Sequence, residues 1–188
     1  ATCEKIEIYK QLYPLFKEEL TQSNLCDLFH NLEMPLSEVL ADMELTGIKL
    51  DPKVLEESSV IIANDLKDIE NKIYEYAGAP FNIGSPKQMG EVLFEKLKII
   101  ENAKLTKTKQ YQTGEEILVK LTNKHPIVPL ILEWRSLSKL KSTYIDALPQ
   151  LINPKTGKIH TTFQQTTTST GRLSSINPNI QNIPIRTD

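Results

Sequence analysis

The stretch that decides the fold is "DPKVLEESSVIIANDLKDIENKIYEYAG", residues 51–78. Asp51 and Pro52 are typical of a helix start, because an aspartate side chain accepts backbone N–H bonds there and proline suits the first helical position. Apolar residues then follow at helical spacing up to Gly78: Leu55, Ile62, Leu66, Ile69, Ile73 and Tyr76. The pattern predicts a helix over 52–77, about 39 Å long. Its single narrow apolar seam requires a partner helix of similar length.

The predicted partner is "IVPLILEWRSLSKLKSTYIDALPQL", residues 127–151, whose apolar side is formed by Leu130, Leu137, Leu140, Tyr144 and Leu148. Between the two helices, Ser85 and Pro86 predict the start of a short helix. Thr113 with Glu116 has the pattern of a capping box for a second short helix. Residues 103–112 are polar and predict a mobile loop. We therefore expect an antiparallel helical pair with a small helical tip.

The flanking segments predict helices first and strands last. Residues 4–20 have helical spacing, and residues 36–47 form an apolar stripe that ends at Gly47: Leu36, Val39, Leu40 and Met43. After Pro149 comes a turn at 153–157, and then the threonine-rich "KIHTTFQQTTT" (158–168), which is typical of a strand. The fold class predicted is α+β, mainly α-helical.

Composition indicates an ordinary soluble chain of 188 residues with 39% hydrophobic residues and a net charge of -2. No apolar run approaches the roughly 20 residues that span a bilayer, and the charged N-terminus predicts no signal peptide. Cys3 and Cys26 have neither metal-site nor disulfide spacing and predict free thiols in a reducing cytoplasm. Residues 135–188 carry a net charge of +5 and the rest of the chain -7. This split favours an anionic partner for the C-terminal part.

No set of residues predicts catalysis or metal binding. His30, His125 and His160 are scattered, and no phosphate loop is present. Arg135, Lys139 and Ser142 share one helix face, which suits either a phosphate backbone or plain solvation, with neither favoured by spacing alone.

The segment "TTTSTGRLSSINPNIQNIPIR" (166–186) is rich in hydrogen-bonding groups and has no acidic residue. Arginine and amide side chains suit minor-groove acceptors, and hydroxyls suit phosphates and sugars. The candidates for such a surface are Thr168, Arg172, Asn179, Gln181 and Asn182. The alternative is a threonine-rich hairpin followed by an Asn177–Pro178 turn, which chemistry alone favours somewhat.

This segment resembles the thumb–palm junction of family A DNA polymerases, the bacterial DNA polymerase I type. The match lies in T-G-R-L-S-S at 170–175 and N-P-N-I-Q-N-I-P-I-R at 177–186, and further similar segments extend it to about 25–187, with weaker similarity over 1–24. The resemblance implies a tail of a 3′–5′ exonuclease-like domain at 1–24, a thumb with its base at 25–150, and the start of a palm at 151–188. Lys5 stands where that exonuclease-like domain has a metal-binding aspartate, which argues against proofreading by the parent.

The resemblance also implies roles for individual residues. Arg172 would reach the minor groove at the primer terminus, and Thr168 would contact the backbone. The remaining DNA-binding residues that it implies are Asn82, Ser85, Arg135, Lys139, Asn179, Gln181, Asn182 and Arg186.

The activity implied for the parent is that of a DNA-directed DNA polymerase, a nucleotidyltransferase of DNA replication and repair that uses Mg²⁺. The family's metal-binding carboxylates and nucleotide-binding helix follow the segment that ends here, so we expect no catalytic residue, no metal ligand and no cofactor in this chain. Alone it would be inactive and would grip primer–template duplex. It would bind no membrane, would be monomeric and would lie in the bacterial cytoplasm with the nucleoid, and dNTP would bind only the full-length enzyme. The alternative is a helical protein-interaction module without a nucleic-acid role.

Overall fold

A computed structural model describes residues 2–101, 103–106 and 109–183. They form two compact units. The hairpin unit comprises the residues up to Lys49 together with Asn153–Asn182, and the helical unit comprises Leu50–Ile152 and Ile183. The domain limits of 1–24, 25–150 and 151–188 are drawn from the resemblance and stay a prediction. The predicted fold class, mainly helical α+β, is confirmed.

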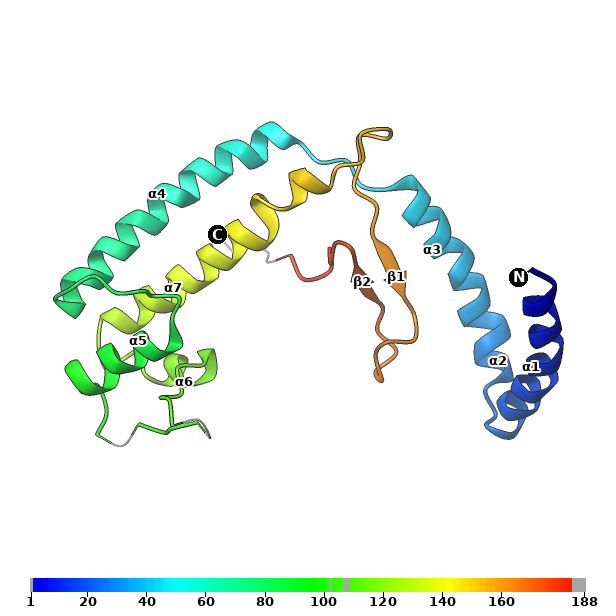
Figure 1. Ribbon diagram of the computed structural model, residues 1–188, viewed down its shortest axis with the longest axis horizontal. Coiled ribbons are helices and arrows are strands. Elements are labelled where there is room, and N and C mark those ends of the chain that lie inside the picture. The colour runs from blue at the N-terminus through cyan, green and yellow to red at the C-terminus, as the bar shows by residue number, and fades with distance from the viewer. Residues whose placement is uncertain (1, 102, 107–108, 184–188) are drawn as a thin grey trace. The chain divides into compact units, whose positions relative to one another are not determined.

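The helical unit contains the predicted antiparallel pair, because α4 and α7 run side by side in opposite directions with α5 and α6 at one end (Figure 1). Its elements are α4 (Pro52–Ala77), α5 (Pro86–Gly90), the π-helical η2 (Glu91–Lys96), α6 (Glu115–Lys120), α7 (Ile127–Leu140), the π-helical η3 (Lys141–Ile145) and the 3₁₀-helical η4 (Leu148–Leu151). Side chains with no exposed surface come from both long helices and the tip: Ile73, Met89, Leu93, Leu118, Ile127, Val128 and Ile131. The tip and the long pair therefore share one core.

The ends of α4 lie where the sequence predicts them. The Asp51 carboxylate accepts hydrogen bonds from the backbone N–H groups of Lys53 and Val54, and Gly78 ends the helix with a left-handed backbone at φ 71°. Ile62, Ile69 and Ile73 of the predicted seam are buried. Tyr76 is not, because Ala77 occupies the last buried position.

The tip agrees with the sequence at one helix start and differs at the other. The Ser85 hydroxyl accepts from the backbone of Gln88, as expected for an N-cap. The capping box at Thr113 and Glu116 is wrong: α6 begins at Glu115 with Gly114 as its N-cap and without a side-chain cap. Thr113 is instead buried, and its carbonyl group accepts a hydrogen bond from Arg135.

The described residues on the two sides of segment 103–112 pair with each other, and the mobility expected of this segment stays a prediction. Leu105 and Tyr111 form an antiparallel bridge, and the Tyr111 ring centroid lies 5.2 Å from that of Phe94. Gly90 permits this packing, because a Cβ atom there would lie 2.7 Å from Cβ of Tyr111. An aromatic ring in a polar run thus packs this segment against η2.

The second long helix is less regular than the sequence predicts. Its α-helical part ends at Leu140 and continues through the π-helical η3, and the side chains that are fully buried include Ile131 but not Leu130 or Leu137. The reason is that α7 packs against both α4 and the tip, which broadens its buried face. At the far end of the pair, Lys141 Nζ donates to Ser59 Oγ at 2.8 Å and to Asp146 Oδ2 at 2.7 Å.

We expect Asp146→Asn to lower the free energy of unfolding by less than about 1 kcal/mol at pH 7, because the carboxylate is 43% exposed and solvent screens the pair. Hydrogen bonds from Lys141 and Ser59 hold the pKa of Asp146 below its ordinary value. Such a carboxylate stabilises the fold above its unfolded pKa of about 3.9 and loses that contribution as the pH falls through the folded value.

Urea unfolding of Asp146→Asn and the unsubstituted chain should therefore differ at pH 7, and the difference should shrink below about pH 4. Asp68→Asn, an exposed aspartate on α4, is the matched control and should show little difference at either pH. An Asp146 effect that stays constant down to pH 3 would contradict the expectation.

The hairpin unit combines helices with a small antiparallel sheet. Its elements are α1 (Thr2–Gln22), α2 (Cys26–Leu28), the π-helical η1 (Phe29–Glu33), α3 (Met34–Thr46), β1 (Thr162–Gln164) and β2 (Ser174–Ile176). Phe163 faces Ser175 in the strand pair. α1 leaves apolar side chains such as Tyr9 and Tyr13 largely exposed, and Leu40 is the buried residue of the predicted 36–47 stripe.

The end of α3 is joined to the segment that leads into β1. Gly47 ends the helix at φ 65°, where a Cβ atom would lie 2.7 Å from the His160 ring. Lys158 Nζ donates to the carbonyl of Thr46 at 2.7 Å, and Nδ1 of His160 lies 2.7 Å from the carbonyl of Glu44. These side chains satisfy carbonyl groups that a helix end leaves without partners.

Candidate nucleic-acid interface

On the helical unit, Lys139 is the freer of the two predicted cations of α7. It lies one turn beyond Arg135, and both line a hollow of about 360 Å³ with Glu115, Leu132 and Ser136. The Lys139 side chain is exposed and makes no hydrogen bond or ion pair with the residues that the structure describes. Its ammonium group is therefore available to an external anion.

Arg135 is engaged within the protein. Its Nη1 donates to the carbonyl of Thr113 at 2.5 Å and its Nη2 lies 3.0 Å from Sδ of Met89. Burial lowers the pKa of the Arg135 guanidinium, and nearby Glu115 opposes that shift. The side chain remains charged at neutral pH, but in this structure its contacts join α7 to residues of the tip. Its predicted contact with the DNA backbone stays a prediction.

Asn82 and Ser85 shape the turn that precedes α5. The Asn82 side-chain oxygen accepts from the backbone N–H of Gly84 at 2.9 Å, while the Asn82 N–H donates to the side chain of Gln88 at 2.7 Å. Gly84 and Arg135 both line a wider hollow of about 920 Å³. The structure thus brings the turn and the guanidinium to one concave surface, with the Asn82 amide group and the Ser85 hydroxyl hydrogen left as donors.

On the hairpin unit, Thr168 and Arg172 lie on the turn between β1 and β2. The Thr168 hydroxyl donates to the carbonyl of Arg172 at 2.5 Å, and Gly171 supplies a left-handed backbone at φ 72°. Arg172 is exposed, and its guanidinium makes no hydrogen bond or ion pair with the described part of the chain. It is therefore a free cation on a braced turn.

Asn179, Gln181 and Asn182 follow β2 on a second turn. The Asn179 side-chain oxygen accepts from the backbone N–H groups of Gln181 at 3.1 Å and Asn182 at 3.3 Å. All three residues are exposed. Asn179 therefore builds the turn, and the exposed side chain of Gln181 projects from it. Arg186 lies outside the described residues.

Sequence reasoning missed the polar residues that hold these two turns. Ser175 is fully buried, and its hydroxyl oxygen accepts from the backbone of Ile180 at 3.1 Å. The Thr161 hydroxyl lies 3.0 Å from the carbonyl of Ile176 and 2.7 Å from that of Pro178. The signal available in the sequence was the position of Ser175 within a strand, where alternate residues face inward. The hairpin expected as the alternative to a DNA-binding surface is present, and its turn carries two of the candidate DNA-binding residues, Thr168 and Arg172.

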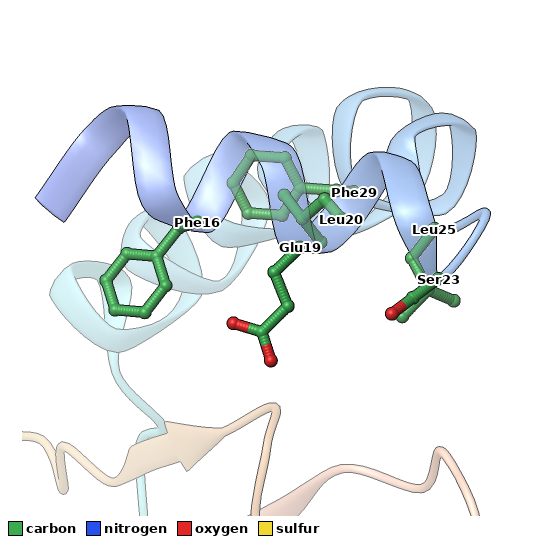
Figure 2. Close-up of a pocket in the computed structure, with 6 residues that line it drawn as sticks. All are labelled: Phe16, Glu19, Leu20, Ser23, Leu25 and Phe29. Atoms are coloured by element: carbon green, nitrogen blue, oxygen red, sulfur yellow. The ribbon is translucent and has the colours of Figure 1, made fainter.

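Three further features of the described residues concern metal ligands, membrane spans and pockets. Across 2–101, 103–106 and 109–183 no group of histidine, cysteine, aspartate or glutamate side chains is arranged to hold a metal ion. In the same residues no helix is long and apolar enough to cross a membrane. A mainly apolar pocket of about 360 Å³ lies at the α1–η1 corner, lined by Phe16, Glu19, Leu20, Ser23, Leu25 and Phe29 (Figure 2). Its one titratable lining residue, Glu19, is exposed, and the only other polar side chain in the lining is Ser23.

Comparison with known proteins identifies the family. The family model described as DNA polymerase family A matches residues 52–188. The chain therefore belongs to DNA polymerase family A.

Relatives and a solved structure agree with this assignment. The chain is 48% identical over 161 residues to DNA polymerase I of Deinococcus radiodurans, covering 86% of this chain and 17% of the relative. It is 52% identical over 167 residues to DNA polymerase I of Chloroflexus aurantiacus, covering 87% of this chain and 18% of the relative. It is also similar to the POL domain of Pol1 from M. smegmatis in complex with DNA primer-template and dNTP, with a TM-score of 0.79 and 40% identity over 91% of this chain and 30% of that one. The chain thus spans less than a fifth of the length of these two curated relatives.

Proposed function

We propose that this chain is the duplex-gripping part of a DNA-directed DNA polymerase of replication and repair. The observation that carries the proposal is the family match over 52–188, joined to the likeness to a polymerase domain that binds primer-template and dNTP. In this proposal residues 25–150 are the thumb and its base, 151–188 begin the palm, and 1–24 end an exonuclease-like domain. No observation favours the alternative of a helical protein-interaction module.

The residues proposed to bind DNA divide by chemistry. Lys139 and Arg135 would contact phosphates from the thumb, where a positive charge adds affinity without sequence preference. Arg172 would bridge minor-groove acceptors near the primer terminus, and Gln181 and Asn182 would contact the duplex beside it. The exposed Asn82 and the half-buried Ser85 would donate to the backbone at the thumb tip.

The chemical step belongs to parts of the polymerase outside the described residues. Family A polymerases use Mg²⁺, which supplies two-metal phosphoryl transfer when bound. The described residues do not fit that ion, since they form no group of three suitable ligands. We therefore derive no step through the metal and propose that the chain alone binds duplex without extending it. The parent would act as a cytoplasmic monomer.

The test is binding of this chain to fluorescent primer–template duplex over a range of salt concentrations. We expect dissociation constants of about micromolar or weaker that rise steeply with salt, without sequence preference. Lys139→Ala should reduce the slope of log affinity against log salt by about 1, whereas Lys67→Ala, an exposed lysine of α4, should leave the slope unchanged. Primer extension by the purified chain with Mg²⁺ and four nucleotides should be absent. Salt-insensitive binding, or template-directed extension by the chain free of host polymerase, would contradict the proposal.

A further inference from the structure

The outer edge of β1 is covered by glutamate side chains. The Phe163 backbone N–H donates to Glu44 Oε1 at 2.6 Å, so this N–H points to the edge away from β2. Next along the chain after β1, the Gln165 side-chain amide donates to Glu33 Oε2 at 2.9 Å and to the Glu33 carbonyl at 3.0 Å. We call Glu33, at the end of η1, and Glu44, in α3, the edge glutamates.

These contacts matter because β1 and β2 are a short two-stranded pair. Such a pair is marginal in water unless it packs against a helix or further strands. Hydrogen bonds to ionised carboxylates are about twice as strong as those between neutral groups. Both edge glutamates are half-buried, so water competes less for them than for an exposed carboxylate. The helical part of the unit is therefore joined to the strand pair through charge-assisted bonds.

The turn that carries Thr168 and Arg172 is braced from within and begins directly after this edge. Gln164, the last residue of β1, accepts hydrogen bonds through its side-chain oxygen from Thr167 at 3.1 Å and Ser174 at 3.3 Å. The Thr168 hydroxyl closes the turn onto Arg172. Because the turn is held together internally, its position follows that of β1.

We propose that Glu33 and Glu44 are positioning residues, which hold the outer edge of β1 and so set where Arg172 meets the primer terminus. This inference rests on the proposed function for its DNA-binding half, whereas the edge contacts themselves stand on the structure. The edge glutamates touch no DNA in this proposal and act through the strand pair.

The first test needs no DNA. Amide hydrogen exchange at Phe163 in this chain should be at least about tenfold faster in Glu44→Ala, because the Phe163 N–H loses the hydrogen bond that protects it from exchange. Glu44→Gln keeps an acceptor oxygen and should stay within about threefold of the unsubstituted chain. Glu38→Ala, an exposed glutamate of α3, is the matched control and should not change the rate. Gln165→Ala removes the hydrogen bonds to Glu33 without changing α3, and it should likewise speed amide exchange at Phe163. Unchanged exchange in both Glu44→Ala and Gln165→Ala would overturn the proposal.

The second test uses the full-length polymerase with the same substitutions. Glu44→Ala should lower the extension rate of saturated primer–template at least about fivefold while the DNA dissociation constant changes less than about twofold, because binding is kept and alignment is lost. Glu44→Gln should recover most of the rate. In the Arg172→Ala background, Glu44→Ala should add little further loss, since residues that act through one another are not additive.

Outcomes of the second test separate the two proposals. Fully multiplicative losses in the double variant would overturn the positioning role while leaving the DNA-binding function intact. A wild-type enzyme that neither binds nor extends primer–template would overturn the proposed function, and with it the role of the edge glutamates, even if the exchange result holds.

Discussion

Arg172→Ala in the full-length polymerase is expected to lower the rate of primer extension by more than about tenfold, equivalent to about 1.4 kcal/mol of activation free energy. The guanidinium is exposed and unpaired within the described residues, on a turn that internal hydrogen bonds hold in place. It can therefore bridge acceptors that a correctly paired terminus presents in the minor groove. Losing that contact misaligns the primer end, which affects the chemical step more than the overall affinity.

The measurement is single-turnover extension at saturating primer–template, paired with equilibrium binding of the same DNA. Lys155→Ala is the matched control, since Lys155 is an exposed cation on the 153–157 turn of the same unit. Lys139→Ala and Arg135→Ala should show the opposite balance, with a larger loss of affinity than of rate. A kinetically silent Arg172→Ala would show that the roles are wrongly distributed along the chain.

Ile73→Ala is expected to cost about 2–5 kcal/mol of unfolding free energy, because the substitution removes buried methyl groups and leaves a cavity. Ile73 has no exposed surface and packs in the core that α4 shares with the tip and α7. Val60→Ala on the same helix is the control: its side chain is 59% exposed, so its change should stay within about 0.5 kcal/mol.

Urea unfolding followed by circular dichroism measures the free energy of unfolding of both variants, and we expect both to show the same dependence of that free energy on urea concentration. An Ile73 loss as small as that of Val60 would mean that the long pair and the tip do not share one core. The same loss should shift DNA binding only through the folded fraction, because Ile73 lies in the buried core and has no surface that DNA could touch.

Local signals in the sequence predicted the helix ends well. Asp51, Pro52 and Gly78 determine α4 through hydrogen bonds and backbone geometry within a few residues, and these are readable without a fold. Thr113 misled for the opposite reason. The residues around it fit a capping box, but its carbonyl accepts a hydrogen bond from the Arg135 guanidinium on α7 and its side chain is buried.

The sequence likewise predicted some residues of the candidate interface better than others. The sequence indicated Arg172 and Lys139, and both are free cations in the described structure. Arg135, a third cation of the predicted set, and Asn179, one of its amides, instead use part of their polar atoms in hydrogen bonds within the protein. Whether a side chain is free depends on partners that folding brings near, and Thr113 and Met89 are distant from Arg135 in sequence. Residue type and spacing could therefore identify candidate DNA-binding residues, but they could not show which of these residues are free to bind DNA.

The antiparallel bridge between Ile48 and Ile159 fixes the point at which the chain leaves the hairpin unit and returns to it. Its two hydrogen bonds measure 2.8 and 2.9 Å. Ile48 directly precedes Lys49, the last residue before segment 50–152, and the backbone N–H of Asn153, the first residue after that segment, donates to the carbonyl of Lys158 beside Ile159. Segment 50–152 is therefore flanked in sequence by a backbone bridge that lies wholly within the hairpin unit. Lengthening or shortening this segment far from the bridge leaves the strand pair's own contacts unchanged. The length of the helical segment can therefore vary without any change in the hydrogen bonds that position the candidate residues of the hairpin unit.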